Sequence, residues 1–227
     1  MQNLGLRVDF HTHSIFSDGS LLPAALVYEA ADRGHQAIAI TDHVDSSNIE
    51  EVLHHLTKFI KEIGPSLPIK VFPGVELSYL PPKLIEKYAQ RARQFGAQVV
   101  IVHGESPNEP AVPRETNHEA LRCKGLVDIL AHPGMITEED AILAKVNDIY
   151  LEISARNGHR KGNNHVAKMA RQFGAKLLVN TDAHSEHDLI TQKEAFLVAD
   201  ESGMKKAEIL LALKDNPQAL IKRIEHR

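Results

Sequence analysis

Six short apolar runs in this sequence each lead into a histidine or carboxylate side chain, and this repetition constrains the fold more than any other feature. The runs are β-branched and almost free of polar residues, which is typical of strands buried on both faces of a parallel sheet. In parallel α/β folds, ligands bind at the carboxyl ends of the strands. The sequence therefore predicts a cluster at one end of the sheet that contains His11, His13, His43, Glu76, His103, His132, Asp182 and His184.

The alternation of strand and helix patterns indicates a repeated βα unit. We expect strands at about residues 6–10, 37–40, 69–75, 98–102, 126–131, 149–153 and 176–179. We expect helices between them at about 22–33, 48–63, 83–95, 138–147 and 163–173. The segment 93–103 is echoed by 171–180, and each copy is a helix end, a glycine and a strand. About seven such strands favour a closed parallel barrel, and an open doubly wound sheet is the alternative.

The chain length fits one domain. Its 227 residues lie within the range of about 200 to 250 that a barrel-like α/β domain commonly takes. We expect a single domain over 1–227 with its core at 6–188, and C-terminal helices over 189–227 packed on the outside of the barrel. Residues 104–117 form the one long irregular connection, which makes them a candidate active-site loop.

Composition excludes several classes of function. The net charge of −4 provides no overall basic field for a nucleic-acid backbone, so a small substrate is favoured and nucleic acid is not an expected partner. Cys123 is the only cysteine, which excludes an internal disulfide and a thiolate-rich zinc site. The 14 histidines are the outlier in the composition, and histidine is well suited to bind first-row transition metals.

Targeting features are absent from the sequence. No run of about 18 uncharged apolar residues occurs, and the first five residues lack the apolar core of a signal peptide. We therefore expect a cytoplasmic protein without a membrane partner. The sequence does not indicate an oligomeric state.

The number of metal-competent side chains indicates more than one ion. With Asp18, the candidates number nine, whereas a single ion takes about four to six ligands. Nine ligands therefore serve two or three ions with carboxylates bridging between them. Clustered divalent ions lower the pKa of a bound water and hold the oxygens of an in-line displacement, so the natural reaction is hydrolysis of a phosphate ester.

The motifs that carry these ligands resemble those of the PHP (polymerase and histidinol phosphatase) family of metallohydrolases. They are His11-Thr12-His13 with Ser17-Asp18-Gly19, Thr41-Asp42-His43, Ala131-His132-Pro133 and Asn180-Thr181-Asp182-Ala183-His184, together with the Gly-Val-Glu element at Glu76 and the lone His103. The resemblance covers roughly residues 7–188. It implies a distorted TIM-like barrel of about seven βα units that holds a trinuclear site loaded with manganese, iron or zinc.

Carried over residue by residue, the resemblance divides the ligands among three divalent ions. The first ion would take His11, His13, Glu76 and Asp182, the second Glu76, His103 and His132, and the third Asp18, His43 and His184. Glu76 would bridge two ions, as a carboxylate can and an imidazole cannot. Asp18 departs most from the pattern, because the family does not always have the same residue type there.

The implied activity is a metal-dependent phosphoesterase, of the phosphatase type, with a metal-bound water or hydroxide as nucleophile. A second metal-bound water, His184 or Asp182 could protonate the leaving group, and these alternatives stay open. Arg156 is the candidate for binding the substrate phosphate, because guanidinium groups fit phosphate oxygens and it follows the strand at 149–153.

Three hypotheses about function follow. The first is a phosphomonoesterase acting on a small phosphorylated metabolite, such as histidinol phosphate or a nucleotide-like monoester. Histidinol phosphatases of this family are often longer than this chain, which weakens the assignment of histidinol phosphate as the substrate. The second is a phosphodiesterase or exonuclease acting on nucleotides or single-stranded DNA. The third is a domain that binds metal only for stability.

The remaining histidines and several other polar residues have separate assignments, and the first six histidines below lie on helices or turns away from the predicted strand ends. We expect surface positions for His35, His54, His55, His118, His187 and His226. A substrate role is an open alternative for His159 and His165, because their segment should face the site. Asp42 either orients His43 or caps a strand end. Glu105 and Arg114 on the long loop are expected mainly in solvent, and Cys123 is expected as a small buried side chain.

Overall fold

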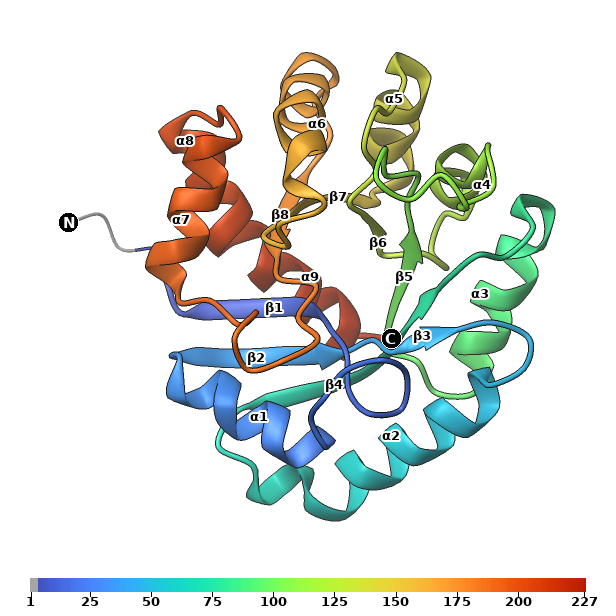
Figure 1. Cartoon of the computed structure of the whole chain (residues 1–227), viewed down its shortest axis with the longest axis vertical. Coiled ribbons are helices and arrows are strands. Elements are labelled where there is room, and N and C mark those ends of the chain that lie inside the picture. The colour runs from blue at the N-terminus through green and yellow to red at the C-terminus, as the bar shows by residue number, and fades with distance from the viewer. Residues whose placement is uncertain (1–3) are drawn as a thin grey trace.

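The computed structural model describes residues 4–227 and shows a parallel sheet that is surrounded by helices (Figure 1). Seven strands follow one another in the order β1-β2-β4-β5-β6-β7-β8, and a short β3 pairs with β4. Every pairing is parallel. The strands are β1 (Arg7–Thr12), β2 (His35–Ile40), β3 (His43–Val44), β4 (Lys70–Leu77), β5 (Val99–His103), β6 (Ile129–Ala131), β7 (Tyr150–Ser154) and β8 (Leu177–Asn180).

Helices connect the strands and cover the outside of the sheet. The α-helices are α1 (Pro23–Asp32), α2 (Ile49–Ile63), α3 (Ile85–Gln94), α4 (Thr116–Arg122), α5 (Glu138–Asn147), α6 (Arg160–Phe173), α7 (Gln192–Glu201), α8 (Lys206–Leu210) and α9 (Asn216–Glu225). Short 3₁₀ turns occupy Gly64–Ser66 and Pro82–Leu84, and a π-helical turn, Leu211–Asp215, joins α8 to α9. None of the helices within residues 4–227 is long and apolar enough to cross a membrane.

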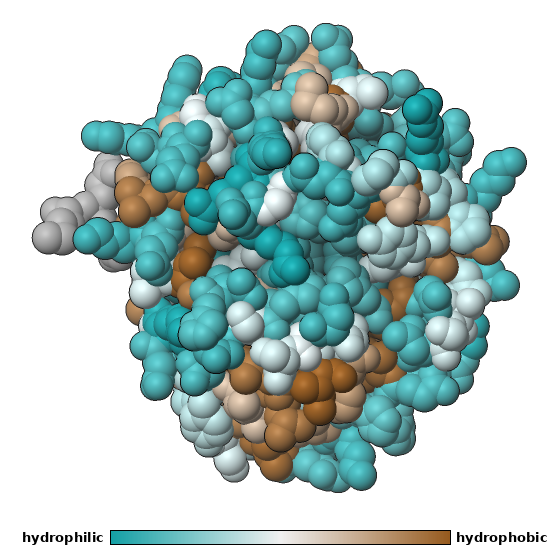
Figure 2. Space-filling view, in the orientation of Figure 1, coloured by the Kyte–Doolittle hydropathy of each residue, from teal (hydrophilic) through white to brown (hydrophobic). Residues whose placement is uncertain are grey.

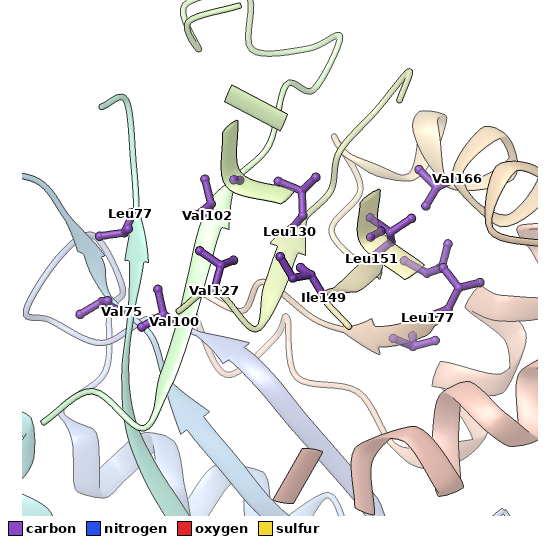
Figure 3. Close-up of a cluster of buried hydrophobic side chains, with 14 of the residues drawn as sticks. Val75, Leu77, Val100, Val102, Val127, Leu130, Ile149, Leu151, Val166 and Leu177 are labelled. Atoms are coloured by element: carbon purple, nitrogen blue, oxygen red, sulfur yellow. The ribbon is translucent and has the colours of Figure 1, made fainter. Parts of the chain in front are cut away.

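The buried side chains form two layers, one on each side of the strands. The outer layer packs the strands against the surrounding helices, and Figure 3 shows part of it, including Val75, Val100, Leu130 and Leu151. The inner layer fills the barrel with the alternate strand residues, among them Val8, Phe10, Phe72, Val99, Ile101, Tyr150 and Leu178. This is the period of two expected for strands that are buried on both faces.

Helix α9 covers the end of the barrel at which the strands begin. Its Leu220 and Ile224 belong to the inner layer. The side chain of Asn216 donates to the carbonyl of Leu177, the first residue of β8, at 2.8 Å. Glu225 pairs with Lys70, the first residue of β4. The opposite end, where the strands finish, is therefore left for a binding site.

The barrel is nearly closed. Between β1 and β8 the described residues form an isolated bridge of Thr12 with Ala183 rather than a continuous ladder. Side chains complete this seam: the Asn180 Oδ1 accepts the backbone N–H of Phe10 at 3.1 Å, and the Arg7 guanidinium donates to a β8 carbonyl at 2.8 Å. The expected TIM-like barrel is confirmed over the doubly wound alternative.

Local differences from the expected elements have physical causes. The long loop ends at Thr116, where α4 begins, and Cys123 follows this helix as a buried residue. His35 was expected at the surface, and that expectation is wrong. It begins β2 two residues before the apolar run, and its Nδ1 lies 2.9 Å from the carbonyl oxygen of Ala30 in a buried position.

The surface view in Figure 2 shows a mostly hydrophilic face, with hydrophobic residues gathered near α1. Leu22 and Tyr28 are among the exposed apolar residues of the chain, at 60% and 56%.

Candidate metal centre

The strand ends gather the predicted ligands at the end of the barrel opposite α9. His11 lies on β1, His43 on β3 and His103 at the end of β5. The others follow strands or sit near their ends, at His13, Asp18, Glu76, His132, Asp182 and His184. Parallel pairing brings these ends together, because neighbouring carboxyl ends meet at one edge of the sheet.

Glu76 is the centre of this arrangement. Its carboxylate is fully buried and faces five imidazole rings. One oxygen, Oε2, lies close to His43 Nδ1, His11 Nε2 and His13 Nε2, at 2.8, 3.3 and 3.6 Å. The other, Oε1, lies close to His103 Nδ1 and His132 Nε2, at 3.1 and 3.6 Å. A carboxylate with histidines on both oxygens has the geometry of a bridging ligand.

Asp182 forms a second centre beside the first. Its Oδ1 lies 3.1 Å from His13 Nε2 and 3.6 Å from His11 Nε2. The backbone of Asp182 has a φ of 55°, and that of His132 has a φ of 26°, both in the left-handed region. Such strain in non-glycine residues persists where the surrounding structure imposes it, and it is common at functional sites.

A third group lies toward solvent. The Asp18 Oδ1 is 3.2 Å from His184 Nε2 and 3.8 Å from His43 Nε2, and the Asp18 side chain is 58% exposed. Asp42 holds the loop that carries Asp18, because its carboxylate accepts the backbone N–H and hydroxyl of Ser14, both at 2.7 Å. Asp42 therefore supports a loop instead of orienting His43.

A close backbone approach brings the ends of β5 and β6 together. A Cβ atom added to Gly104 would lie 2.2 Å from the carbonyl oxygen of Ala131. Only glycine allows this contact. It places His103 and His132 side by side, with ring centroids 4.5 Å apart.

The donor atoms fit divalent metal ions. The Nε2 of His11 and both ring nitrogens of His132 are buried and make no hydrogen bond within residues 4–227. Buried polar atoms are normally satisfied, so a set of orphaned imidazole nitrogens around carboxylates indicates cation ligands. Groups of three or four donor atoms lie within 4.8 Å of one another throughout the cluster. Mixed nitrogen and oxygen donors suit manganese, iron and zinc.

The electrostatics of the cluster are dominated by mutual attraction. Burial raises the pKa of Glu76, but His11, His43 and His103 outweigh this effect and hold the pKa well below its usual range. Burial alone would lower the pKa of His103, yet Glu76 and Glu109 raise it to about 10. The carboxylates therefore stay ionised and keep the site attractive to cations.

A cavity of about 430 Å³ opens onto the cluster, and Arg156 lies in its wall. The Arg156 Nη1 donates to the Asp182 carbonyl at 2.9 Å, and its Nε is 3.7 Å from Asp182 Oδ2. The guanidinium is 36% exposed, so it remains available to a ligand in the cavity. Exposed Tyr79 forms part of the rim and stacks on His103, with 5.3 Å between ring centroids.

Two further residues of the site, neither of them a predicted ligand, come from loops. His159, left open by the sequence, is buried and stacks on His132 at 3.9 Å between centroids, and its Nε2 is 3.5 Å from Asp182 Oδ2. Glu109 on the long loop contacts His103 Nε2 and was not predicted. A single glutamate in an irregular segment has no periodicity that could reveal it.

The remaining open residues lie away from the metal cluster. His165 bonds the Ile136 carbonyl at 2.7 Å, so it supports a loop. Glu105 accepts the backbone N–H of Asn117 at 3.0 Å, and Arg114 is exposed beside a second cavity. These three residues do not line the cavity that contains Arg156.

The chain has relatives among curated proteins. The uncharacterized protein MJ1295 of Methanocaldococcus jannaschii is 46% identical over 220 residues, which are 96% of this chain and 100% of that protein. The DNA polymerase/3'-5' exonuclease PolX of Bacillus subtilis is 26% identical over 96% of this chain and 41% of its own length. Ribonuclease P protein component 3 of Methanosarcina barkeri is 28% identical over 95% of this chain and 88% of its own length.

Solved structures share the fold, and a family model assigns the chain. Histidinol phosphate phosphatase from Lactococcus lactis, solved with zinc, L-histidinol and phosphate, superposes with a TM-score of 0.62 at 18% identity, covering 88% of this chain and 94% of that chain. An archaeal ribonuclease P chain superposes with a TM-score of 0.60 at 16% identity, covering 95% and 93%. The PHP domain model matches residues 9–205, so the resemblance is confirmed and this chain belongs to the PHP family of metal-dependent phosphoesterases.

Proposed function

We propose that this protein hydrolyses a small phosphomonoester, such as histidinol phosphate or a nucleotide-like monoester, with divalent metal ions. The observation that supports this most is the fully buried Glu76 carboxylate, which faces five histidines beneath a cavity whose wall contains Arg156. A structural polar core would pair such histidines with hydrogen-bond acceptors instead of leaving their nitrogens orphaned. The same observation argues against a metal with only a stabilising role, because the cluster opens onto a cavity.

In this proposal, nine side chains hold three ions. His11, His13, Glu76 and Asp182 take the first, Glu76, His103 and His132 the second, and Asp18, His43 and His184 the third. Manganese, iron or zinc bound there would supply Lewis acidity and activate the attacking water. The zinc in the Lactococcus lactis structure supports zinc as one choice for this chain.

The chain's own residues bind and orient the substrate. Arg156 binds the phosphate oxygens from the cavity wall. Asp182 stays ionised, because His11 and His13 lower its pKa against the effect of burial, so it can accept a hydrogen bond from the attacking water. His184 borders both the third ligand group and the cavity. It would act as a ligand when an ion is bound there, and a water on a metal would then supply the proton to the leaving group. Without that ion, His184 itself would supply this proton.

A nuclease or phosphodiesterase is the second candidate. PolX is named as an exonuclease and the Methanosarcina barkeri protein as a ribonuclease P component, which supports nucleic acid as a ligand class. Exposed Tyr79 at the rim could stack on a base. Against this candidate, the net charge of −4 provides no overall basic surface along which a nucleic-acid backbone could bind.

Two readouts over a substrate panel test the proposal: release of inorganic phosphate from the monoesters, and chromatography of the products for the cyclic phosphate and the DNA. The manganese-loaded protein would be assayed with histidinol phosphate, nucleoside monophosphates, a cyclic phosphate and a short single-stranded DNA. We expect one small monoester to be preferred, with a kcat/KM above about 10⁴ M⁻¹s⁻¹, which is typical of enzymes on their own substrates. Cleavage of the diester or DNA alone would support the second candidate. No turnover at full metal occupancy would contradict both.

A further inference from the structure

Glu152 lies at the base of the metal centre, inside the barrel. It is the middle residue of β7, and it shares the inward face with Tyr150 and Ser154, whereas Leu151 and Ile153 pack outward against the helices. Its side chain is fully buried. The sequence conceals it, because it is a single acidic residue within an otherwise apolar strand.

The contacts of Glu152 point to one histidine. Its Oε2 lies 2.8 Å from the Nδ1 of His11 and accepts a hydrogen bond from the Asn180 amide at 3.0 Å. The orientation of Asn180 is fixed, because its Oδ1 accepts the backbone N–H of Phe10 at 3.1 Å, so its Nδ2 must face Glu152. Asn180 therefore holds the carboxylate in place beside the imidazole ring.

These contacts determine which nitrogen of His11 carries the proton. An ionised carboxylate only accepts hydrogen bonds, so the Nδ1 of His11 must be the N–H. In the neutral ring that a metal ion requires, the lone pair then lies on Nε2, which is 3.3 Å from Glu76 Oε2 and 3.6 Å from Asp182 Oδ1. We propose that Glu152 is a positioning residue that fixes the tautomer and orientation of His11, so that Nε2 faces the metal site. This inference rests on the proposed metal centre.

The charge environment separates this role from a structural one. Asp128, also fully buried, is paired with arginines: Arg93 at 2.6 Å and Arg227 at 2.7 Å. Within residues 4–227, no lysine or arginine lies within 4.0 Å of the Glu152 carboxylate, and its ionic contact is His11. A buried carboxylate without a cationic partner is costly. The Arg7 guanidinium attracts Glu152 only from beyond this distance. A metal ion on the far side of His11 would add positive charge through the imidazole, as in carboxylate–histidine–metal triads.

The Glu152→Gln variant tests the inference with two measurements. The first is the tautomer of His11 in the metal-free protein, read by ¹⁵N NMR of labelled histidine at a pH above the raised pKa of His11, where the ring is neutral, and assigned with a His11→Gln variant. The second is Zn²⁺ affinity, measured by competition with a chelating dye, together with the number of ions bound. We expect Nδ1–H in the wild type, a mixed tautomer in Glu152→Gln, and one ion bound about 10- to 100-fold more weakly.

The Asp128→Asn variant is the matched control, because it neutralises another buried carboxylate. It should lose stability and yet keep the His11 tautomer and the zinc affinity of the wild type. Equal loss of zinc affinity in both variants would show a general structural effect and overturn the inference. So would Nε2–H in wild-type His11, a result that does not depend on how any Glu152 variant folds. A wild type that binds no Zn²⁺ would instead overturn the proposed metal centre.

Discussion

His43 and Glu76 are register partners on the neighbouring strands β3 and β4, and the His43 Nδ1 lies 2.8 Å from the Glu76 Oε2. The two-residue strand β3 thus has a clear consequence: its pairing holds an imidazole against the central carboxylate of the site. The strand register therefore determines the distance between these two side chains of the metal cluster. A shift of one residue would turn either side chain to the other face of the sheet.

Replacing Glu76 with glutamine is the most direct test of the cluster. The amide removes the charge between five histidines, so the number of bound metal ions should fall below that of the wild type. The value of kcat/KM should drop by at least about 100-fold, which is more than the loss usually caused by replacing a residue that contacts a ligand but not the metal. Elemental analysis and phosphate release measure the two effects. Glu86→Gln, the same change on the exposed face of α3, serves as the control. Full metal content with wild-type turnover in Glu76→Gln would contradict the bridging role.

Arg156→Ala should weaken substrate use without removing metal. A charge-assisted hydrogen bond contributes about 1.5 to 3 kcal/mol, which corresponds to a loss of about 10- to 100-fold in kcat/KM for a phosphomonoester. Metal content should stay at the wild-type value, because Arg156 is not a ligand. Lys161→Ala, an exposed cation of the same segment, is the control and should have little effect. If Arg156→Ala retained full kcat/KM, the phosphate would have to bind elsewhere.

The strand ends could be predicted from the sequence because one physical rule governs all of them. Doubly buried parallel strands need continuous apolar runs, and a polar residue at most three positions after such a run, such as His103 or Asp182, lies where the strand leaves the core. This rule led to the barrel and to the residues of the cluster. It needs no knowledge of the connecting loops.

The parts that could not be predicted depend on contacts distant in the sequence. Glu109 reaches His103 only because an irregular loop folds back over the barrel, and Glu152 acquires its importance from the position of His11 on another strand. The burial of His35 depends on the Ala30 carbonyl at the end of the preceding helix. Hydrophobic periodicity cannot reveal such partners, because it indicates which face of a strand or helix is buried and not which hydrogen bonds an individual side chain makes.

His35 makes stability depend on pH. Burial and the nearby Arg7 lower the pKa of His35 to about 3, from the ordinary histidine value of about 6.5. At mildly acidic pH, His35 therefore binds a proton in the unfolded chain but stays neutral in the folded protein. The contribution of His35 to the free energy of unfolding is complete above pH 6.5 and is lost as the pH falls toward 3. The loss should be about 1.4 kcal/mol per pH unit below the unfolded pKa.

Chemical denaturation of the metal-saturated protein between pH 7 and 5 measures this dependence. The metal-saturated state is used because the histidines of the cluster also titrate when no ion is bound. His35→Gln removes the titrating group, so the slope of unfolding free energy against pH should be shallower than in the wild type. An unchanged slope in that variant would assign the pH dependence to other residues.

Asp128 anchors the C-terminal helix to the barrel, and its replacement should reduce stability but not activity. The carboxylate is fully buried and pairs with Arg93 at 2.6 Å, Arg227 at 2.7 Å and Arg223 at 3.3 Å. Arg223 lies in α9, and Arg227 follows this helix. Asp128→Asn leaves the Arg93 guanidinium largely buried without its counter-charge, which typically costs about 3 to 5 kcal/mol. Urea unfolding should show this loss, whereas metal content and kcat/KM at 25 °C should match the wild type, since Asp128 lies at the end of the barrel away from the metal cluster.

Arg227→Ala removes one partially exposed partner of Asp128, so it should lower the free energy of unfolding by less than Asp128→Asn does. A larger loss for Arg227→Ala than for Asp128→Asn would show that Arg227 stabilises the fold mainly through contacts other than the one with Asp128.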